Sequence, residues 1–274
     1  MKIFLTGASG FIGKNFVNEA IKKKHFVYCL SRKNRKSKNK NIKWIKGELD
    51  ANLTEVLEDC DVFVHLAALG VKRNKINSDE IFKTNIFDSY NLITKAIESN
   101  CKKFVIVSTS SEYGLKSLDL KRISKRDERM PKTFYGLSKV IFSNMIKNLS
   151  KKSKCKFRIM RLFPIYGNGE SPERLFPSLK KAAIKGKNFE IKNPSEFRDF
   201  TTVDYAVSAL VRSCVFKKKS KNFEIFHVSS GNSLTIENFA KKMWKKFKAK
   251  GKLTFTNKKF FFSEHLSDPD SNWK

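Results

Sequence analysis

The sequence predicts an α/β protein in which helices cover both faces of a doubly wound parallel sheet. Short apolar runs alternate with helical patterns along the first 163 residues. A glycine-rich turn follows the first of these runs. The chain has 274 residues, 40% of them hydrophobic, which is enough to bury a sizeable core. Strands that alternate with helices need crossover connections, and these connections are right-handed.

The first half of the chain supplies most of the expected sheet. Its runs are apolar throughout, as in strands that are buried on both faces. The expected strands are Ile3–Thr6, Phe26–Ser31, Ile42–Ile45, Val62–Leu66, Phe104–Ser108 and Phe157–Leu162. The expected helices lie near residues 11–24, 52–59, 80–99 and 133–152.

After residue 163 the regular alternation of strand and helix patterns ends, and Pro and Gly residues indicate a loop. We expect helices near residues 173–186, 204–217 and 235–248, and strands near 189–191, 199–203, 225–229 and 253–256. The strand at Ile225–Ser229 is predicted to rejoin the main sheet. We therefore expect a sheet domain at residues 1–163 and a smaller, interleaved lobe at residues 164–274. The tail after Lys258 carries no clear pattern.

The formal net charge of +31 allows two interpretations. One is a nucleic-acid-binding protein with a basic face. The other is a general lysine bias in an enzyme that has anionic ligands. The excess is spread along the chain, and none of its clusters is interleaved with aromatic residues as a base-stacking surface would be. Nucleic acid is therefore not expected as the main partner.

Cysteine usage and hydropathy indicate a cytoplasmic protein. The five cysteines are far apart and form no C-x-x-C pair, which fits a reducing compartment and predicts no metal site. The first apolar run is too short for a signal peptide, and no stretch is long enough and free enough of charge to span a membrane. No membrane partner is expected.

Three glycines in the first turn predict a site for a dinucleotide pyrophosphate. Gly7 permits a tight turn, Gly10 lets phosphates approach the backbone, and Gly13 lets the following helix pack against the strand. That helix opens at Phe11 and Ile12, where free N–H groups and the positive end of the helix dipole favour an anion. The strand–turn–helix context makes the motif specific.

The end of the second expected strand favours NADP over NAD. An NAD site places a carboxylate about 20 residues after the glycines, where it binds the ribose 2′-hydroxyl. Here the strand ends in Ser31-Arg32-Lys33, without a carboxylate. Arg32 is able to hold a 2′-phosphate with two charge-assisted hydrogen bonds. Alternatively, Arg32 and Lys33 simply begin a solvated basic loop.

Two further turns complete the expected cofactor site. Glu48 and Leu49 follow the third strand and are expected at the edge of the adenine. The small residues Ala67 and Ala68 follow the fourth strand and let a loop pass over the pyrophosphate. We interpret His65 as a strand-end residue rather than a catalyst.

A tyrosine and a lysine predict the chemistry. Tyr135 and Lys139 lie four residues apart at the start of a helix, which places the phenol and the ammonium on one face. A nearby ammonium favours the phenolate, and lowering a tyrosine pKa by about three units takes roughly 4 kcal/mol. Thr109 and Ser111 follow the fifth strand, at the edge where parallel sheets bind ligands. A hydroxyl there is expected to hold a substrate oxygen beside Tyr135.

Together these residues resemble the extended short-chain dehydrogenase/reductase family, in its branch of nucleotide-sugar epimerases, dehydratases and 4-ketoreductases. The resemblance covers nearly the whole chain. The matching segments are Thr6–Gly13, His65–Ala68, Thr84–Asn85, Ser108–Gly114, Tyr135–Lys139, Arg161–Phe163, Tyr166–Gly167, Arg198–Phe200 and Val203–Asp204. It implies a Rossmann-type fold, with NADP on residues 1–163, a nucleotide-diphosphate sugar on the lobe at 164–274, and a homodimer.

The resemblance also implies roles for individual residues. Tyr135 is the acid–base, Lys139 is its electrostatic partner and a ribose ligand, and Thr109 orients the sugar. Arg198 grips the diphosphate of the substrate. Arg174 and Leu175 lie near its nucleotide. The family also uses Asn85 to hold the helix that carries Tyr135.

Departures from the family pattern limit which of the family's reactions are expected of this chain. The 4,6-dehydratases have an acidic residue where Ser111 stands, and Glu112 is one place off and is expected to point elsewhere. A related epimerase–reductase uses a cysteine at that position. The UDP-galactose 4-epimerase type has Asn at the position of Pro164 and an acidic residue at that of Ser31.

Three functional hypotheses follow from these departures. The favoured one is NADPH-dependent reduction of a nucleotide-linked 4-keto-6-deoxy sugar for surface polysaccharide, as in CDP-abequose-type reductases. An alternative is an NAD(P)-dependent nucleotide-sugar 4-epimerase. A third is a non-catalytic protein that senses NADP or associates with RNA.

Overall fold

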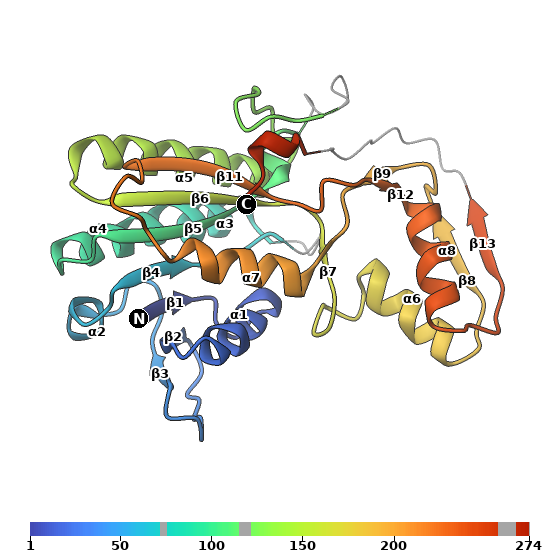
Figure 1. Cartoon of the computed structure of the whole chain (residues 1–274), viewed down its shortest axis with the longest axis horizontal. Coiled ribbons are helices and arrows are strands. Elements are labelled where there is room, and N and C mark those ends of the chain that lie inside the picture. Colours follow the sequence, from blue (N-terminus) through green and yellow to red (C-terminus); the bar gives the residue numbers. More distant parts are fainter. Residues whose placement is uncertain (72–75, 115–121, 257–266, 274) are drawn as a thin grey trace.

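Seven parallel strands form the central sheet, which confirms the predicted doubly wound, Rossmann-type fold (Figure 1). The computed structural model describes residues 1–71, 76–114, 122–256 and 267–273. The strand order across the sheet is β11-β6-β5-β4-β1-β2-β3. Their bounds are β1 Lys2–Thr6, β2 Phe26–Ser31, β3 Ile42–Lys46, β4 Val62–His65, β5 Lys103–Thr109, β6 Lys156–Leu162 and β11 Phe223–Val228. The order reverses between β1 and β4, which is where open α/β sheets bind ligands.

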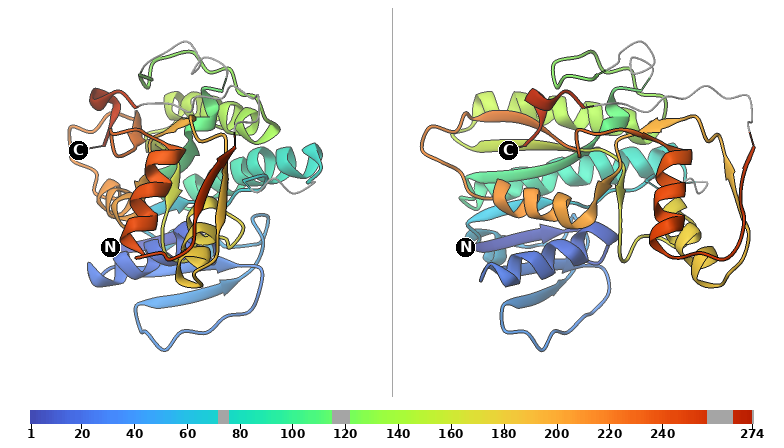
Figure 2. Two further views of the ribbon diagram at one scale, coloured as in Figure 1. Left: turned by 90° about the vertical axis from the view of Figure 1, so that its right-hand side faces the viewer. Right: turned by 45° about the vertical axis from the view of Figure 1, so that its right-hand side comes forward.

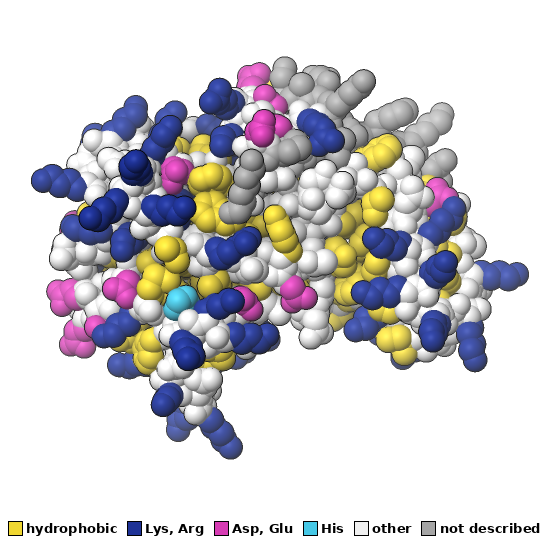
Figure 3. Space-filling view, viewed as in Figure 1, with side chains coloured by type: hydrophobic (Ala, Val, Ile, Leu, Met, Phe, Trp, Pro, Cys, Tyr) yellow, Lys and Arg dark blue, Asp and Glu magenta, His cyan; other side chains and the backbone are white. Residues whose placement is uncertain are grey.

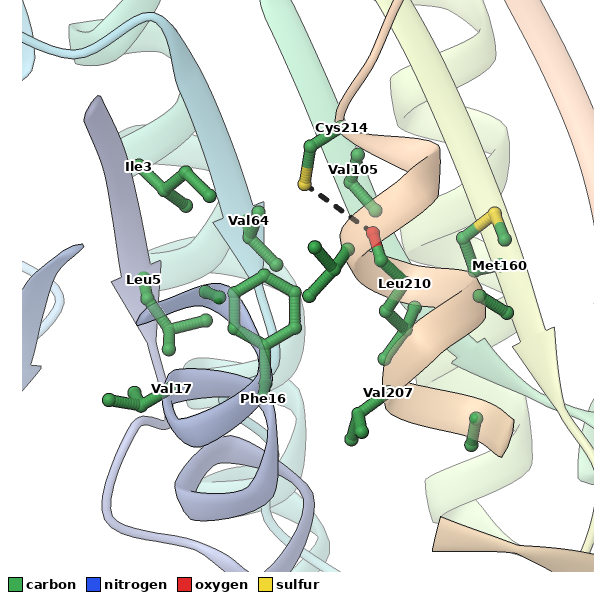
Figure 4. Packing of buried hydrophobic residues seen from close by; sticks show 14 of the residues in the cluster. Ile3, Leu5, Phe16, Val17, Val64, Val105, Met160, Val207, Leu210 and Cys214 are labelled. Carbon is green, nitrogen blue, oxygen red and sulfur yellow. Dashed lines mark hydrogen bonds between the residues drawn. The ribbon is translucent and has the colours of Figure 1, made fainter. Parts of the chain in front are cut away.

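Helices cover both faces of the sheet. Helices α1 (Phe11–Lys22) and α7 (Val203–Ser213) pack on one face, where Phe16 meets Val207 and Leu210 beside strand residues such as Val64 (Figure 4). Helices α2 (Thr54–Glu58), α4 (Ser89–Glu98) and α5 (Phe134–Lys152) bury the other face. The apolar strands are therefore covered on both sides, as their composition predicts.

A small lobe lies beyond the carboxyl edge of the sheet (Figures 1 and 2). Its core joins α6 (Leu175–Ile184), β8 (Phe189–Lys192), α8 (Ile236–Lys246) and β13 (Leu253–Thr256). Short strand pairs connect it to the sheet domain: β7 (Ile165–Tyr166) with β10 (Thr201–Thr202), and β9 (Phe197–Arg198) with β12 (Leu234–Thr235). Helix α7 packs on the main sheet and β11 is one of its strands. The chain therefore crosses between the sheet domain and the lobe more than once. The division at residue 163 stays a prediction.

Two expected elements differ from the structure. The long helix near 80–99 is three pieces: α3 (Ser78–Phe82), a π-helical segment η1 (Lys83–Asp88) and α4. The π-helical segment has a wider turn than an α-helix, and its residues Asn85 and Ile86 are buried in the protein interior. The strand near 199–203 is only the two-residue β10, because Thr202 caps α7 by accepting a hydrogen bond from the Tyr205 N–H at 3.3 Å.

The segment 267–273 returns to the main sheet beside β11. The backbone N–H of Trp273 donates to the His227 carbonyl at 2.9 Å, and the Trp273 ring packs edge-on against Phe226 at 4.7 Å. Ser267 and Ser271 are buried there. Residues 257–266, the first part of the unassigned tail, lie outside the described residues.

All five cysteines, Cys29, Cys60, Cys101, Cys155 and Cys214, are buried and form no disulfide bond.

The high net charge is visible on the surface. Figure 3 shows lysine and arginine side chains spread over both the sheet domain and the lobe. Within the described ranges, no helix is long and apolar enough to cross a membrane.

A glycine pair tests the packing of the first turn. A Cβ at residue 13 would lie 2.1 Å from the Gly7 carbonyl oxygen, whereas at residue 10 its nearest neighbour, the same oxygen, is 3.3 Å away. We expect Gly13→Ala to lower the free energy of unfolding by about 1–3 kcal/mol, since the backbone must shift. Gly10→Ala, the matched control, changes it less. Urea unfolding followed by circular dichroism measures both, and equal losses would contradict the packing argument.

Candidate functional site

The glycine turn packs tightly against the end of β4. Gly7 has φ +70°, which favours glycine, and a Cβ there would lie 2.7 Å from the Ala67 backbone nitrogen. The Thr6 hydroxyl accepts hydrogen bonds from the Leu66 and Ala67 N–H groups, both at 3.2 Å. The sequence predicts both turns for the cofactor site, and the structure brings them into contact.

The N-terminus of α1 has the features of an anion site. Gly10 is its N-cap residue, and no side chain in the described part of the chain caps it. The N–H groups of Phe11 and Ile12 therefore lack intrahelical partners and lie at the positive end of the helix. A Cβ at Gly10 would meet only the Gly7 oxygen among the described atoms within 4 Å. This open, glycine-lined approach fits a dinucleotide pyrophosphate.

The end of β2 carries a basic residue that the sequence analysis missed. The buried Ser31 hydroxyl accepts from the Arg35 Nε at 3.2 Å and from the Lys33 N–H at 3.3 Å. The Arg35 guanidinium also lies over the Trp44 ring, 5.4 Å from its centroid. Arg32 is exposed. In the sequence, Arg35 stands four residues after Ser31 and cannot be distinguished from the other basic residues around it.

The end of β3 lies next to this serine. The Gly47 N–H donates to the Ser31 carbonyl at 3.0 Å, which brings Glu48 and Leu49 to the same edge of the sheet. Glu48 is exposed and Leu49 is half-buried. Their expected contact with the adenine stays a prediction.

Thr109, Tyr135 and Lys139 come together at the carboxyl edge of β5. The Thr109 side chain lies near the Tyr135 phenol, and its hydroxyl accepts a hydrogen bond from the Ser111 N–H at 3.1 Å. Lys139 is only 3% exposed, and its ammonium donates to the Val107 carbonyl at 3.2 Å. The Thr133 hydroxyl caps α5 by accepting from the Gly136 N–H at 3.0 Å, which fixes the first turn that carries Tyr135.

The electrostatics of this group differ from the expectation. Burial raises the pKa of Tyr135 to about 12 and lowers the pKa of Lys139 to about 8. The Lys139 ammonium bonds to Val107 rather than to the phenol. The side chains of the protein therefore favour a neutral phenol. A phenolate at neutral pH needs further positive charge beside Tyr135.

Asn85 connects the helix α5 to the turn after β4. Its side-chain amide donates to the Leu69 carbonyl and to the Ser138 hydroxyl, both at 3.0 Å, and its oxygen accepts from the Leu69 N–H at 2.8 Å. Asn85 is buried within the π-helical segment η1. The contact with the Tyr135 helix, which the family resemblance implies, is present.

Three residues predicted to bind substrate line one cleft in the lobe. Arg174, Leu175 and Arg198 border this cleft, which has a volume of about 350 Å³. Burial raises the pKa of the Tyr135 phenol, and the positive charge of Arg174 at the cleft acts in the opposite direction. Aromatic rings form part of its wall, among them Phe200.

Buried carboxylates hold the two arginines of the cleft. Glu170 pairs with Arg174 at 3.5 Å, and burial raises the Glu170 pKa. Arg198 pairs with Glu196 at 3.0 Å. Next to it, buried Asp199 accepts hydrogen bonds from the Thr201 hydroxyl and from the loop at residues 230–231. This fixes the turn that points Arg198 into the cleft.

Ser111 and Glu112 have different environments. Ser111 is exposed, and its N–H donates to the Thr109 hydroxyl at 3.1 Å. Glu112 is completely buried and pairs with Arg161 at 3.0 Å, and it lies in a 3₁₀ turn rather than in the extended segment on which the spacing argument relied. His65 is bound between Thr6 and Ser89, and burial lowers its pKa to about 3, which suits a structural role.

The parallel sheet, with a glycine turn between its first strand and helix, has the architecture of nucleotide-binding proteins of the Rossmann class. The sequence model of the NAD dependent epimerase/dehydratase family matches residues 3–229. The chain belongs to this family, and it is an NAD(P)-dependent enzyme of the nucleotide-sugar epimerase and dehydratase type.

Curated relatives are named as nucleotide-sugar epimerases and dehydratases. An uncharacterised UDP-glucose epimerase of Bacillus subtilis is 31% identical over 228 residues, which are 77% of this chain and 71% of that protein. The human dTDP-D-glucose 4,6-dehydratase is 24% identical over 265 residues, 88% of this chain and 73% of that protein.

Solved structures share the fold. The UDP-N-acetylglucosamine 4-epimerase of Methanobrevibacter ruminantium, in complex with UDP-N-acetylmuramic acid, superposes with a TM-score of 0.87 at 22% identity, covering 97% of this chain and 89% of that one. A UDP-glucuronic acid 4-epimerase of Bacillus cereus, in complex with UDP-glucuronic acid and NAD, gives 0.81 at 23% identity, covering 100% and 90%.

The Asn85 contacts generate a stability prediction. We expect Asn85→Ala to lower the free energy of unfolding by about 1–3 kcal/mol, because it leaves buried polar groups of Leu69 and Ser138 with fewer partners. Asn91→Ala, at an exposed position of α4, is the matched control and changes it little. Urea denaturation measures both variants. An Asn85→Ala protein as stable as the control would contradict a connecting role.

Proposed function

We propose that this enzyme is an NAD(P)-dependent nucleotide-sugar 4-epimerase. The observation that carries the proposal is the placement of Thr109, Tyr135 and buried Lys139 at the carboxyl edge of β5, together with a cleft that Arg174 and Arg198 border. A nucleotide-diphosphate sugar bound there has its diphosphate on the arginines and its sugar toward Tyr135. The epimerases among the relatives support this choice over plain reduction.

The residues divide the proton chemistry at C4 between them. Positive charge that an oxidised cofactor would add beside Tyr135 favours its phenolate. The phenolate would accept the proton of the C4 hydroxyl as the sugar is oxidised, and would return it when the 4-keto sugar is reduced on its other face. Thr109 hydrogen-bonds to the same oxygen and orients it. The Gly7–Gly13 turn would hold the cofactor, which would supply the hydride chemistry at C4. Lys139 lies on the same helix as the phenol and would bind the cofactor ribose.

Ser111 argues against elimination of water from the sugar. Dehydration needs a second acid–base next to the reacting carbons. Ser111 is a neutral hydroxyl, and the nearby Glu112 is fully buried in an ion pair with Arg161. The residues around Thr109 therefore support chemistry at C4 alone.

An assay with UDP-, dTDP-, CDP- and GDP-sugars tests the reaction. We expect purified enzyme to interconvert C4 epimers without net consumption of the cofactor, measured by chromatography of the sugar nucleotides. Tyr135→Phe should lower kcat by about 100-fold or more, since it removes the proton-transfer group. The cofactor Kd should hardly change. Full turnover by Tyr135→Phe would overturn the assignment.

Reduction of a 4-keto-6-deoxy sugar is the second candidate, and one observation favours it. The β2 end has no carboxylate for a ribose 2′-hydroxyl and places Arg35 on Ser31 instead. This arrangement supports NADP, and exchangeable NADPH suits net reduction. In the assay above, oxidation of NADPH by 4-keto sugars without epimerisation would favour this candidate.

The proposed preference for NADP distinguishes this chain from the Bacillus cereus neighbour, which carries NAD. We expect Arg35→Ala to weaken NADPH binding about 10-fold through lost charge-assisted bonds to the 2′-phosphate, with NADH binding unchanged. Lys36→Ala, an exposed basic residue of the same loop, is the control. Titration of intrinsic fluorescence gives each Kd. Equal losses for both cofactors would contradict a 2′-phosphate contact.

A homodimer and a cytoplasmic location complete the proposal. Phe87 and Phe134 are 61% and 57% exposed on the two helical segments that would pair across a two-fold axis. Large exposed apolar side chains on a helical face fit such an interface.

A further inference from the structure

Glu112 is a buried carboxylate that four different parts of the chain contact. It accepts hydrogen bonds from the Ser108 hydroxyl at the end of β5 and from the Ser143 hydroxyl of α5, the latter at 3.0 Å. It also pairs with Arg161 of β6 at 3.0 Å and with Arg129 of the loop before α5 at 3.3 Å. Its side chain is 0% exposed. Two guanidinium groups and two hydroxyls thus compensate the buried charge.

These contacts connect the segments that carry the reacting side chains. Ser108 directly precedes Thr109, and Glu112 itself ends the short 3₁₀ turn Ser110–Glu112. Ser143 lies one helical turn after Lys139 on α5. A single carboxylate therefore joins the Thr109 turn to the helix of Tyr135 and Lys139.

A second layer of buried polar contacts holds Arg161. Its guanidinium donates to the Tyr113 hydroxyl and to the Lys125 carbonyl, the latter at 3.1 Å. The Tyr113 hydroxyl lies 2.6 Å from the His227 Nε2, and the His227 Nδ1 lies 2.9 Å from the Ser267 hydroxyl. Glu112 is thus anchored to the main sheet and to the segment 267–273.

We propose that Glu112 is a positioning residue of the reaction, which fixes the Thr109 turn against α5 and, through its hydrogen bond with Ser143, places a negative charge one helical turn from Lys139. This inference rests on the proposed C4 chemistry. Glu112 touches neither substrate nor cofactor in this role. It acts through Thr109, Tyr135 and Lys139.

The charges around Lys139 support this role. Burial lowers the Lys139 pKa, and the Glu112 carboxylate raises it. From β4, His65 faces Lys139 as a neutral ring, since its own pKa is about 3. From β6 and the preceding loop, Arg161 and Arg129 face Glu112 and offset part of its charge. On its own helix, Tyr135 is a neutral phenol with a pKa of about 12. Glu112 thus helps keep Lys139 protonated near neutral pH.

Variants of Glu112 and its partners test the inference through the alkaline limb of the kcat profile. Glu112→Gln should move this limb to lower pH by about one unit, since Lys139 loses a facing carboxylate. Its kcat at pH 7 should fall about 10-fold with little change in KM. Arg129→Gln should move the limb the opposite way, because Glu112 is then less compensated. Ser143→Ala removes one hydrogen bond without a change of charge, and should leave the limb in place.

A second readout does not depend on activity. Carbon-13 labelling of lysine ε-carbons, with Lys139→Arg for assignment, reports the titration of Lys139 in the full chain by NMR. The Lys139 midpoint should fall in Glu112→Gln, rise in Arg129→Gln and stay in Ser143→Ala. Unchanged midpoints in both charge variants would overturn the inference even if the enzyme epimerises sugars. Shifted midpoints in an enzyme that turns over no sugar would instead overturn the proposed function alone. If Glu112→Gln does not fold, the inference is tested by the Lys139 midpoint in Arg129→Gln: a rise supports it and an unchanged midpoint overturns it.

Discussion

All seven strands of the main sheet run parallel, so every turn with a candidate functional side chain leaves the sheet at one edge. The glycine turn follows β1, Ser31 ends β2, Ala67 follows β4 and Thr109 ends β5. The reversal of strand order between β1 and β4 separates the crossovers there and leaves room for a ligand. The lobe stands beyond the same edge and adds the arginine-lined cleft. The parallel arrangement therefore assembles a site from residues more than 100 positions apart.

Burial of charge is the second constraint on this edge. Lys139, Glu112, Arg161 and Asp199 are nearly inaccessible to water, and the structure provides each with polar partners. Such groups strongly disfavour alternative arrangements, because a shift of one partner leaves another charge uncompensated. Precise placement of Thr109, Tyr135 and Arg198 is thus coupled to the stability of the fold.

The sequence predicts features that depend on local pattern and misses those that depend on tertiary contact. Alternating apolar runs and the Gly7–Gly13 spacing are sufficient for the fold, and the spacing of Tyr135 and Lys139 predicts one helix face. Arg35 is one of many basic residues in the sequence, and only the folded loop places it on Ser31. The anchoring role of Glu112 likewise requires Arg161, which is 49 residues away and reaches it through the pairing of β5 and β6.

The position of β11 at one end of the sheet bears on how the protein folds during synthesis. Its partner β6 ends at Leu162, but β11 begins only at Phe223, after α6 and β8 of the lobe have been made. The segment 267–273 then covers β11 last. Until then, one side of β6 has unpaired backbone groups that could pair with another chain. Contacts between residues this distant in sequence slow folding. The nascent sheet domain therefore passes through a stage in which one side of β6 is unpaired. Interactions that shield β6 during this stage would favour its correct pairing with β11.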